Sequence, residues 1–283
     1  MRLNYLMLLI ASAALFSGCS LADIRNEQIK AGMTPEMKEK GRLILNQLQK
    51  TYRSDLWAKK KLMTVTYADE WPGFFSRTMV MPWHKNRQQV RFEMVLGTDD
   101  GRIEFLEEPH KGDVWGIQHW ATYKITAGNP PQFRKDKDIW FWLPTYSYFT
   151  QCAYRIGEAT VVAFAGEETL NGENYEKVFA TWETAEPNPK IDQYMIWVNK
   201  KTGYIDLVEY TIRDMQKFMT DKLFYADYRL VDGIPVAHRQ SAGDVYGGTA
   251  VVHQAEFKSV QFSDTFDTRR LYPDAQQKWS KYN

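Results

Sequence analysis

Apolar side chains recur at helical spacing near the start of the chain. Thr34 is a typical N-cap, and Pro35 suits the first position of a helix. The apolar positions that follow fall near one side of such a helix: Met37, Ile44, Leu45, Leu48 and Tyr52. The pattern predicts an amphipathic helix over 35–52 that packs on a core.

From residue 62 onward the pattern changes to short runs of β-forming residues separated by turns. Pairs such as Asn171-Gly172 and Asp232-Gly233 are typical of hairpin turns. We predict strands over 62–67, 74–81, 89–96, 102–107, 113–125, 160–165, 175–182, 193–199, 204–213, 223–230, 235–242 and 249–262. Between the two groups of strands the sequence predicts a polar loop over 126–138, an aromatic run over 139–144 and a helix over 145–155.

The segment 113–125 has the clearest alternation of the predicted strands. As one strand, it would place on a single face Trp115, Ile117, His119, Ala121, Tyr123 and Ile125. About a dozen antiparallel strands in one sheet tend to curl, because their twist accumulates. We therefore predict a mainly β fold of the α+β class: a curved antiparallel half-barrel, one domain over 34–283, covered by the N-terminal helix and the mid-chain helix.

The first residues of the chain have the order of parts of a secretory signal. Arg2 is followed by an uncharged apolar stretch over 5–16 that is too short to span a bilayer. The stretch Phe16-Ser17-Gly18-Cys19 resembles the lipobox of bacterial lipoproteins, and Ser20 resembles the outer-membrane class of these proteins. The resemblance implies a signal peptide over 1–18, a lipidated Cys19 and a tether over 19–33. An ordinary secretory signal with a cysteine nearby is the alternative.

Charge and composition exclude some partners and leave others open. The signal holds one arginine, so the remaining chain has as many basic residues as its 35 acidic ones. Such a balance gives no electrostatic footprint for nucleic acid. Aromatic residues make up 14% of the chain. They favour strands and also line apolar cavities, so both uses remain open.

The residues that carry most enzyme chemistry do not form a recognisable motif. The five histidines lack metal-ligand spacing, and neither a nucleophile elbow nor a phosphate-binding loop occurs. Cys152 lies in an aromatic run and is expected to be a buried, inert thiol. His119 is interpreted as a core histidine or a general base, and His110 as part of a solvated loop or a metal site. We predict that the protein is not an enzyme and binds no metal or cofactor.

Two hairpins resemble a known family. The stretches are DQYMIWVNKKTGYID over 192–206 and DYRLVDGIPV over 227–236. They are similar to recurrent hairpins of the LolA/LolB-like lipoprotein-localisation superfamily. The resemblance covers most of 37–262 and implies a half-open β-barrel, closed by helices, with a hydrophobic cavity that takes acyl chains. This chain adds the segment 126–144, and no residue role is carried over from the family.

These observations lead to one hypothesis and two alternatives. The hypothesis is an outer-membrane lipoprotein that faces the periplasm and binds a lipid or acyl chain in a half-barrel cavity. The first alternative is an interaction lipoprotein with a filled core, whose partner is an envelope protein, and the second is an envelope hydrolase. The candidate cavity residues are Trp115, Ile117 and Tyr123 on the strand 113–125, and Trp140, Trp142 and Phe149 on the mid-chain lid.

The lipidation of Cys19 is directly testable. The variant Cys19→Ser should leave an unprocessed precursor or a soluble periplasmic form, because serine cannot take the diacylglyceryl group through sulfur. Labelling of cells with radioactive palmitate should show no incorporation into the variant. Continued acylation would sink the lipobox interpretation.

Overall fold

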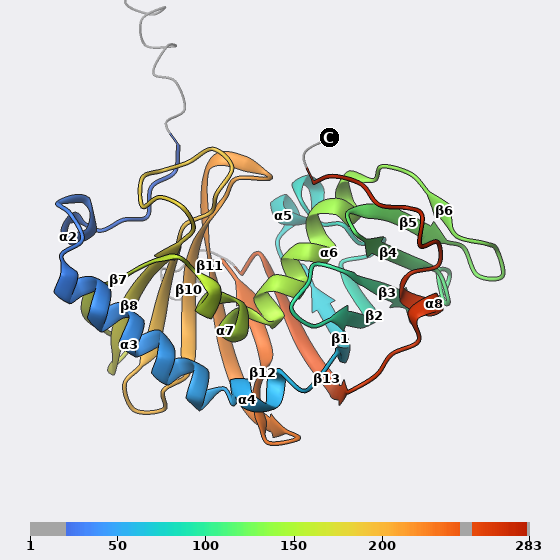
Figure 1. Ribbon diagram of the computed structural model, residues 1–283. Helices are drawn as coiled ribbons and strands as arrows, with labels where there is room; N and C mark the ends of the chain where they lie inside the picture. The colour runs from blue at the N-terminus through green and yellow to red at the C-terminus, as the bar shows by residue number, and fades with distance from the viewer. Residues whose placement is uncertain (1–20, 244–250, 282–283) are drawn as a thin grey trace, which may run out of the picture.

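The protein is described from a computed structural model, in which residues 21–243 and 251–281 are placed (Figure 1). A single antiparallel sheet of 13 strands forms its framework. The strands are β1 Leu62–Glu70, β2 Arg87–Val95, β3 Gly101–Phe105, β4 Val114–Gln118, β5 Ala121–Ile125, β6 Gln132–Phe133, β7 Val161–Leu170, β8 Glu173–Thr181, β9 Tyr194–Asn199, β10 Ile205–Ile212, β11 Gln216–Val231, β12 Ile234–Ala242 and β13 His253–Ser263.

The sheet consists of two meanders, which are joined through the first and the last strand of the chain. Strands β1 to β6 follow one another in space, and so do β7 to β13. The first and last strands then pair, with Leu62 opposite Ser263 and Glu70 opposite Gln254. The free edges of the sheet are therefore β6 and β7, which do not pair with each other. The predicted curved antiparallel half-barrel is confirmed.

The helices lie at the edges and on the concave side of this sheet. They are α2 Glu27–Lys30, α3 Pro35–Thr51, α4 Ser54–Trp57, α5 Phe74–Met79, α6 Lys137–Thr150, α7 Cys152–Arg155, a 3₁₀ turn Ile156–Glu158 and α8 Thr268–Leu271. Helix α3 confirms the first predicted helix, and the Thr34 hydroxyl caps it by accepting a hydrogen bond from the Met37 N–H at 3.3 Å. Among the described residues, no helix is long and apolar enough to cross a bilayer.

The mid-chain helix begins earlier than predicted. Asp136 caps it by accepting hydrogen bonds from the N–H groups of Asp138 and Ile139, so the run 139–144 is helical. Pro144 lies inside α6. Proline usually ends a helix because it removes a hydrogen bond. Here the buried side chains on both sides of Pro144 hold the helix on the sheet. The helix therefore begins eight residues before the predicted start at residue 145.

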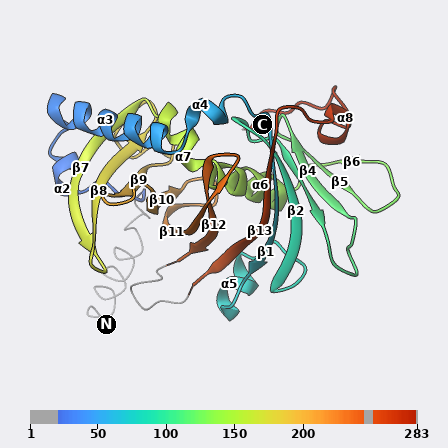
Figure 2. The same ribbon diagram turned by 90° about the horizontal axis from the view of Figure 1, so that it is seen from below.

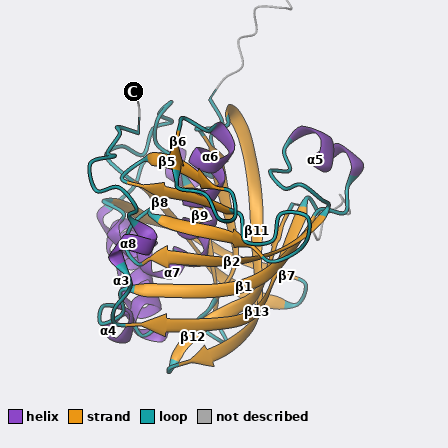
Figure 3. Cartoon of the chain, turned by 90° about the vertical axis from the view of Figure 1, so that its right-hand side faces the viewer, coloured by secondary structure: helices purple, strands orange, loops and turns teal. Residues whose placement is uncertain are grey.

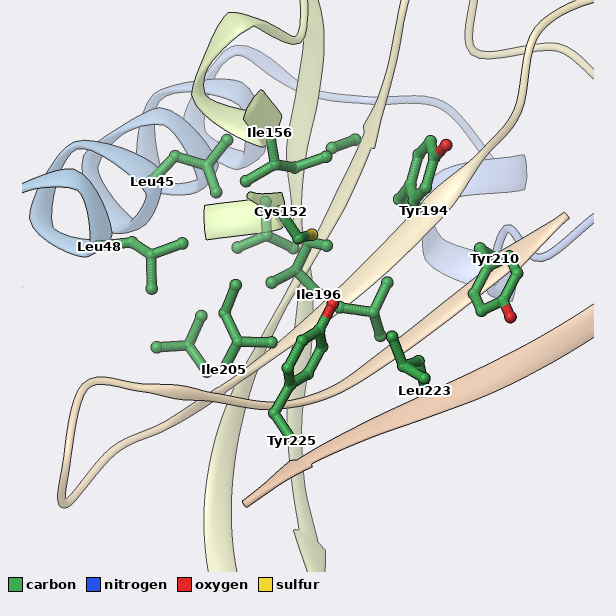
Figure 4. Packing of buried hydrophobic residues seen from close by; sticks show 14 of the residues in the cluster. Leu45, Leu48, Cys152, Ile156, Tyr194, Ile196, Ile205, Tyr210, Leu223 and Tyr225 are labelled. Carbon is green, nitrogen blue, oxygen red and sulfur yellow. The ribbon is translucent and has the colours of Figure 1, made fainter. Parts of the chain in front are cut away.

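Helix α6 spans the two halves of the hydrophobic core. Its first part contributes Ile139, Trp142 and Leu143 to the core under β1–β4, β12 and β13. Its last turn contributes Phe149 to the core under β7–β12, where α3 and α7 also pack. Figure 4 shows this second core, with residues of both helices facing those of the strands: Leu45, Leu48, Cys152, Ile156, Ile196 and Tyr225. Figure 2 shows α6 between the two ends of the sheet.

The segment after residue 20, suggested as a tether, contacts the sheet. Ala22 and Ile29 are buried, and Ile29 packs with Phe179 and Trp197 on the face opposite α7. The Asn26 amide donates a hydrogen bond of 2.6 Å to the backbone oxygen of Ala165. The described part of the segment is therefore fixed to the domain. The predicted signal 1–18 and Cys19 lie outside the described residues.

Two strand predictions are wrong. Residues 74–81 form helix α5 and its end instead of a strand. Residues 113–125 form two strands, because His119 and Trp120 adopt φ angles of 44° and 63° and turn the chain. In the resulting hairpin Tyr123 pairs with Gly116, so it lies on the face opposite to Trp115 and Ile117.

The packing of α3 on the edge strand β7 can be tested at Gly41. A Cβ atom there would lie 2.6 Å from the carbonyl carbon of Ala163 and 2.7 Å from the nitrogen of Phe164, and backbone atoms cannot move aside cheaply. Alanine favours helices over glycine by roughly 0.5–1 kcal/mol. We nevertheless expect Gly41→Ala to lower the free energy of unfolding by about 1–3 kcal/mol.

Urea unfolding measures this change. The control is Asn46→Ala on the exposed side of α3, which should leave stability unchanged or slightly raised. Equal or higher stability of Gly41→Ala would contradict the close packing of α3 on β7.

Candidate functional site

Two cavities of several hundred Å³, about 430 and 310 Å³, adjoin helix α6. They share three side chains of this helix, namely Phe141, Thr145 and Phe149, and both also reach Tyr210 and Ile212 on β10. We call them the apolar cavity and the polar cleft. The helix thus forms a wall of both, as expected for a segment that crosses the concave face.

The apolar cavity has a volume of about 310 Å³ and lies between α5, α6 and strands β10 to β13. Its lining is mainly apolar: Val80, Phe141, Trp142, Phe149, Met215, Met219, Leu223, Val252 and Ala255. Cavities that bind small molecules usually have volumes of at least about 300 Å³ and apolar walls with few polar groups. The two methionines add side chains that adapt to irregular ligands.

A buried aspartate organises one wall of this cavity. Asp69 on β1 is fully buried. Its Oδ2 accepts hydrogen bonds from the indoles of Trp71 at 3.0 Å and Trp83 at 2.6 Å, and from the Tyr146 hydroxyl at 2.6 Å. Its Oδ1 lies 3.0 Å from Nδ1 of His253. Tyr146 and His253 line the cavity, whereas Asp69 does not. Asp69 therefore orients two polar side chains of the cavity wall without lining the cavity.

The His253 ring is held in one orientation. It stacks on Trp71 with ring centroids 4.5 Å apart, and Tyr146 contacts it edge-on. The proton on Nδ1 donates to the Asp69 carboxylate, which leaves Nε2 as the other hydrogen-bonding atom of the ring. Within the described part of the chain, no hydroxyl group bonds this nitrogen. Ser76, which lines the same cavity, directs its Oγ to the backbone oxygens of Gly73 and Val252.

A second acidic group lines the apolar cavity. Asp221 on β11 accepts a hydrogen bond from the Lys222 N–H at 2.8 Å, and the Tyr210 hydroxyl lies 3.4 Å from its Oδ2. Burial raises the pKa of the Asp221 carboxyl above its usual range, and these bonds and His253 partly oppose the change. The cavity therefore offers a carboxyl and an imidazole to the polar end of a ligand.

The polar cleft on the other side of α6 has a different character. Its volume is about 430 Å³, and aromatic and charged side chains line it together. The aromatic residues are Trp120, Trp140, Phe141, Tyr148, Phe149, Trp182, Tyr194 and Tyr210, and the charged residues are Asp99, Arg155, Glu183, Lys190, Asp192, Asp214 and Lys281. An alkyl chain would leave these charges desolvated, so the apolar cavity suits a hydrophobic ligand better.

The predicted cavity residues are divided among four places. Trp142 lines the apolar cavity, Trp140 lines the polar cleft, and Phe149 lines both. Trp115 and Ile117 are buried in the filled core under β1–β4 and line neither cavity. Tyr123 lies on the opposite face of the sheet, where its hydroxyl donates to the Leu271 backbone oxygen at 3.2 Å.

Sequence reasoning did not identify Asp69, His253, Asp221 or the two cavity methionines. One signal existed in β1, where Met63, Val65, Tyr67 and Asp69 alternate along the strand and all are buried. An acid that continues an apolar face is costly unless it is paired, so it marks a structured polar site. The partners of Asp69 come from distant segments and are not visible from spacing.

The other chemical groups are placed as follows. The expected burial of Cys152 is confirmed, and this burial raises the pKa of its thiol to about 12, which disfavours the reactive thiolate. His119 lies in the β4–β5 turn, half-exposed and 3.5 Å from Asp100, which fits neither a core histidine nor a cavity base. His110 pairs with Asp113 at 3.0 Å. In residues 21–243 and 251–281 no three acidic, histidine or cysteine side chains converge as metal ligands.

The role of Asp69 can be measured by unfolding. Asp69→Ala would leave two indoles, a hydroxyl and an imidazole without their buried acceptor. We expect a loss of about 3 kcal/mol or more in the free energy of unfolding, and a smaller loss for Asp69→Asn, which keeps one acceptor oxygen. The exposed Asp232→Asn serves as a control and should change stability little. A Tm of Asp69→Ala equal to that of the control would refute this role.

Comparisons with known proteins identify the architecture. No family model matches the sequence, and no curated protein matches it. A putative outer membrane lipoprotein-sorting protein domain from Vibrio parahaemolyticus superposes with a TM-score of 0.52 at 11% identity, over 83% of this chain and 97% of that one. A DUF1329 family protein from Desulfovibrio piger gives 0.52 at 11% identity, over 85% and 98%.

A LolA superfamily protein from Nitrosomonas europaea is also similar, with a TM-score of 0.49 at 10% identity, over 81% of this chain and 96% of that one. At such low identity the comparisons bear on the fold alone. The resemblance seen in the two hairpins is confirmed at that level. This chain has the fold of the lipoprotein-sorting protein domain from Vibrio parahaemolyticus and of the DUF1329 family protein from Desulfovibrio piger.

Proposed function

We propose that the protein is an outer-membrane lipoprotein that binds an acyl chain in the apolar cavity and takes part in lipid or lipoprotein handling in the bacterial envelope. The observation that carries the proposal is the cavity of about 310 Å³ beside α6, whose walls are mainly apolar. Each methylene group buried there would contribute about 0.8 kcal/mol to binding.

The size and walls of the cavity limit the ligand. A volume near the lower end of the range for small-molecule sites accepts one acyl chain or part of one, not a whole diacyl lipid. Met215 and Met219 can repack around chains of different shape. His253 and Asp221 supply the polar contacts that would orient an attached head group. The cavity therefore favours a class of ligand instead of a single compound.

The fold and the start of the chain support an envelope location. The similar domain from Vibrio parahaemolyticus is described as an outer membrane lipoprotein-sorting protein domain. The lipobox-like stretch before Cys19 fits a protein that is attached to a membrane by its N-terminus. Together these features favour a tethered binder over a soluble shuttle.

The interaction lipoprotein with a filled core, called the interaction module below, remains a second candidate, and one observation favours it. Half of the concave face is filled by its own side chains, since Trp83, Trp115 and Phe105 pack together under β2–β4. If the apolar cavity in the other half binds no ligand, the protein would act through its surface. An envelope hydrolase is less well supported, because the Ser76 hydroxyl donates to the backbone oxygens of Gly73 and Val252 and not to the His253 ring.

Binding of a fluorescent fatty-acid probe distinguishes these functions. Val252→Trp would fill the apolar cavity, because Val252 lines it and is only partly buried. We expect this variant to keep the wild-type Tm and to bind the probe roughly tenfold more weakly or worse, as a blocked cavity requires. The control Leu43→Trp on the exposed side of α3 should bind the probe as the wild type does.

Ile117→Arg adds a contrast, because it places an unpaired charge in the filled core and should unfold the protein. If the wild type binds no probe, the interaction module becomes the better function.

A further inference from the structure

Large apolar side chains are exposed at one end of the molecule. Phe74 and Met79 on α5 are 78% and 66% exposed, and Phe218 at the start of β11 is 51% exposed. The other two large exposed apolar residues among those described, Leu43 and Leu230, lie on α3 and at the far end of β11. We call Phe74, Met79 and Phe218 the apical residues. Helix α5 projects from the molecule at this end (Figure 3).

The apical residues lie on the elements that line the apolar cavity, although they are not part of its lining. The lining residues are Ser76 of α5, Val80 directly after it, and Met215 and Met219 of the β10–β11 hairpin. Side chains on these elements thus point both into the cavity and out to solvent. An exposed apolar cluster beside an apolar cavity indicates a surface that becomes covered in function.

The described chain starts at the same end (Figure 1). The Ala22 N–H donates a hydrogen bond of 2.9 Å to the Lys217 backbone oxygen, next to Phe218. The buried Arg213 guanidinium donates to the backbone oxygens of both Ala22 and Lys217. These bonds fix residue 22 to the tip of the β10–β11 hairpin.

This attachment limits where a lipid anchor can be. Only three residue steps separate Ala22 from Cys19, and an extended chain spans at most about 3.6 Å per step. The Cα atom of Cys19 is therefore within roughly 11 Å of the Ala22 Cα, and a lipid on Cys19 enters the bilayer near the hairpin tip. The bilayer surface is then close enough for the hairpin and its neighbour α5 to touch it.

We propose that the domain docks on the phospholipid surface through Phe74, Met79 and Phe218, so that the apolar cavity opens toward the bilayer. The proposal rests on the proposed lipidation of Cys19 and on ligand binding in the cavity. Arg77 on α5 and the exposed Lys217 beside Phe218 supply positive charge for anionic head groups. A lipid chain could then pass from the bilayer into the cavity with little contact with water.

Site-specific fluorophores test the orientation. The lipidated protein is reconstituted into vesicles of phosphatidylethanolamine and phosphatidylglycerol, with a polarity-sensitive probe on Phe74→Cys or Phe218→Cys. Labelling is specific, because Cys152 is buried with a raised pKa and a lipidated Cys19 has no free thiol. Matched controls carry the probe on Leu43→Cys or Leu230→Cys, which are similarly exposed.

The expected result is a blue shift of emission and quenching by a lipid-phase quencher at positions 74 and 218, with neither effect at 43 and 230. Equal behaviour at all four positions would overturn the proposal. Protection of 74 and 218 in whole envelopes but not in the vesicles would also overturn it, in favour of a protein partner.

A binding measurement separates this proposal from the proposed function. On the unlipidated Cys19→Ser background, the triple variant Phe74→Ser, Met79→Ser, Phe218→Ser should reduce sedimentation with the same vesicles roughly tenfold or more. The double variant Leu43→Ser, Leu230→Ser should not reduce it. The fatty-acid probe should bind both variants in solution as it binds the wild type. Absence of probe binding would refute the proposed function, whereas unchanged sedimentation of the triple variant refutes docking.

Discussion

The pairing of β1 with β13 determines the arrangement of the rest of the protein. It joins the first strand to the last and makes one sheet of two meanders. The edges β6 and β7 are consecutive in the chain but lie at opposite ends of this sheet. The segment between them has to cross the concave face, and α6 is that crossing. The apolar cavity exists because a cylinder laid across a curved sheet touches it along some strands and leaves space beside others.

The same pairing brings the cavity wall together. Asp69 on β1 reaches His253 at the start of β13, two strands that become neighbours only when the sheet is complete. A buried carboxylate that accepts four hydrogen bonds is tolerated because every donor is already positioned for it. It holds Trp71, Trp83 and Tyr146 in fixed orientations, and so gives rigidity to a wall that faces an adaptable pair of methionines. A preformed polar wall lowers the entropy cost of binding an oriented ligand.

Much of the fold could be predicted from local pattern, and the errors have physical causes. Helix α3 has an N-cap, a proline at its start and a clear apolar side, so it was predicted within one residue of its end. The β4–β5 turn was missed because its two residues with positive φ angles are His119 and Trp120, and not the glycine or asparagine that usually marks such a turn. The start of α6 was missed because Pro144 suggested a break that tertiary packing overrides.

The candidate site was less predictable than the fold. Trp142 and Phe149 line the apolar cavity, and their role in ligand binding stays a prediction. Trp115 and Tyr123 were assigned to one face by a period of two that the hairpin interrupts. No spacing in the sequence connects Asp69 with His253 or Ala22 with Lys217, since these contacts depend on how distant strands register.

The two free edges of the sheet would matter for a protein that is held at a membrane surface, as the proposed lipid anchor implies. Strand β7 is covered by α3, whose Gly41 allows the helix to contact the strand backbone, and β6 has only two residues. Uncovered strand edges recruit other strands, and confinement to a plane would raise the rate of such encounters. With one edge covered and the other short, anchored copies would be able to crowd side by side without polymerising into a continuous sheet.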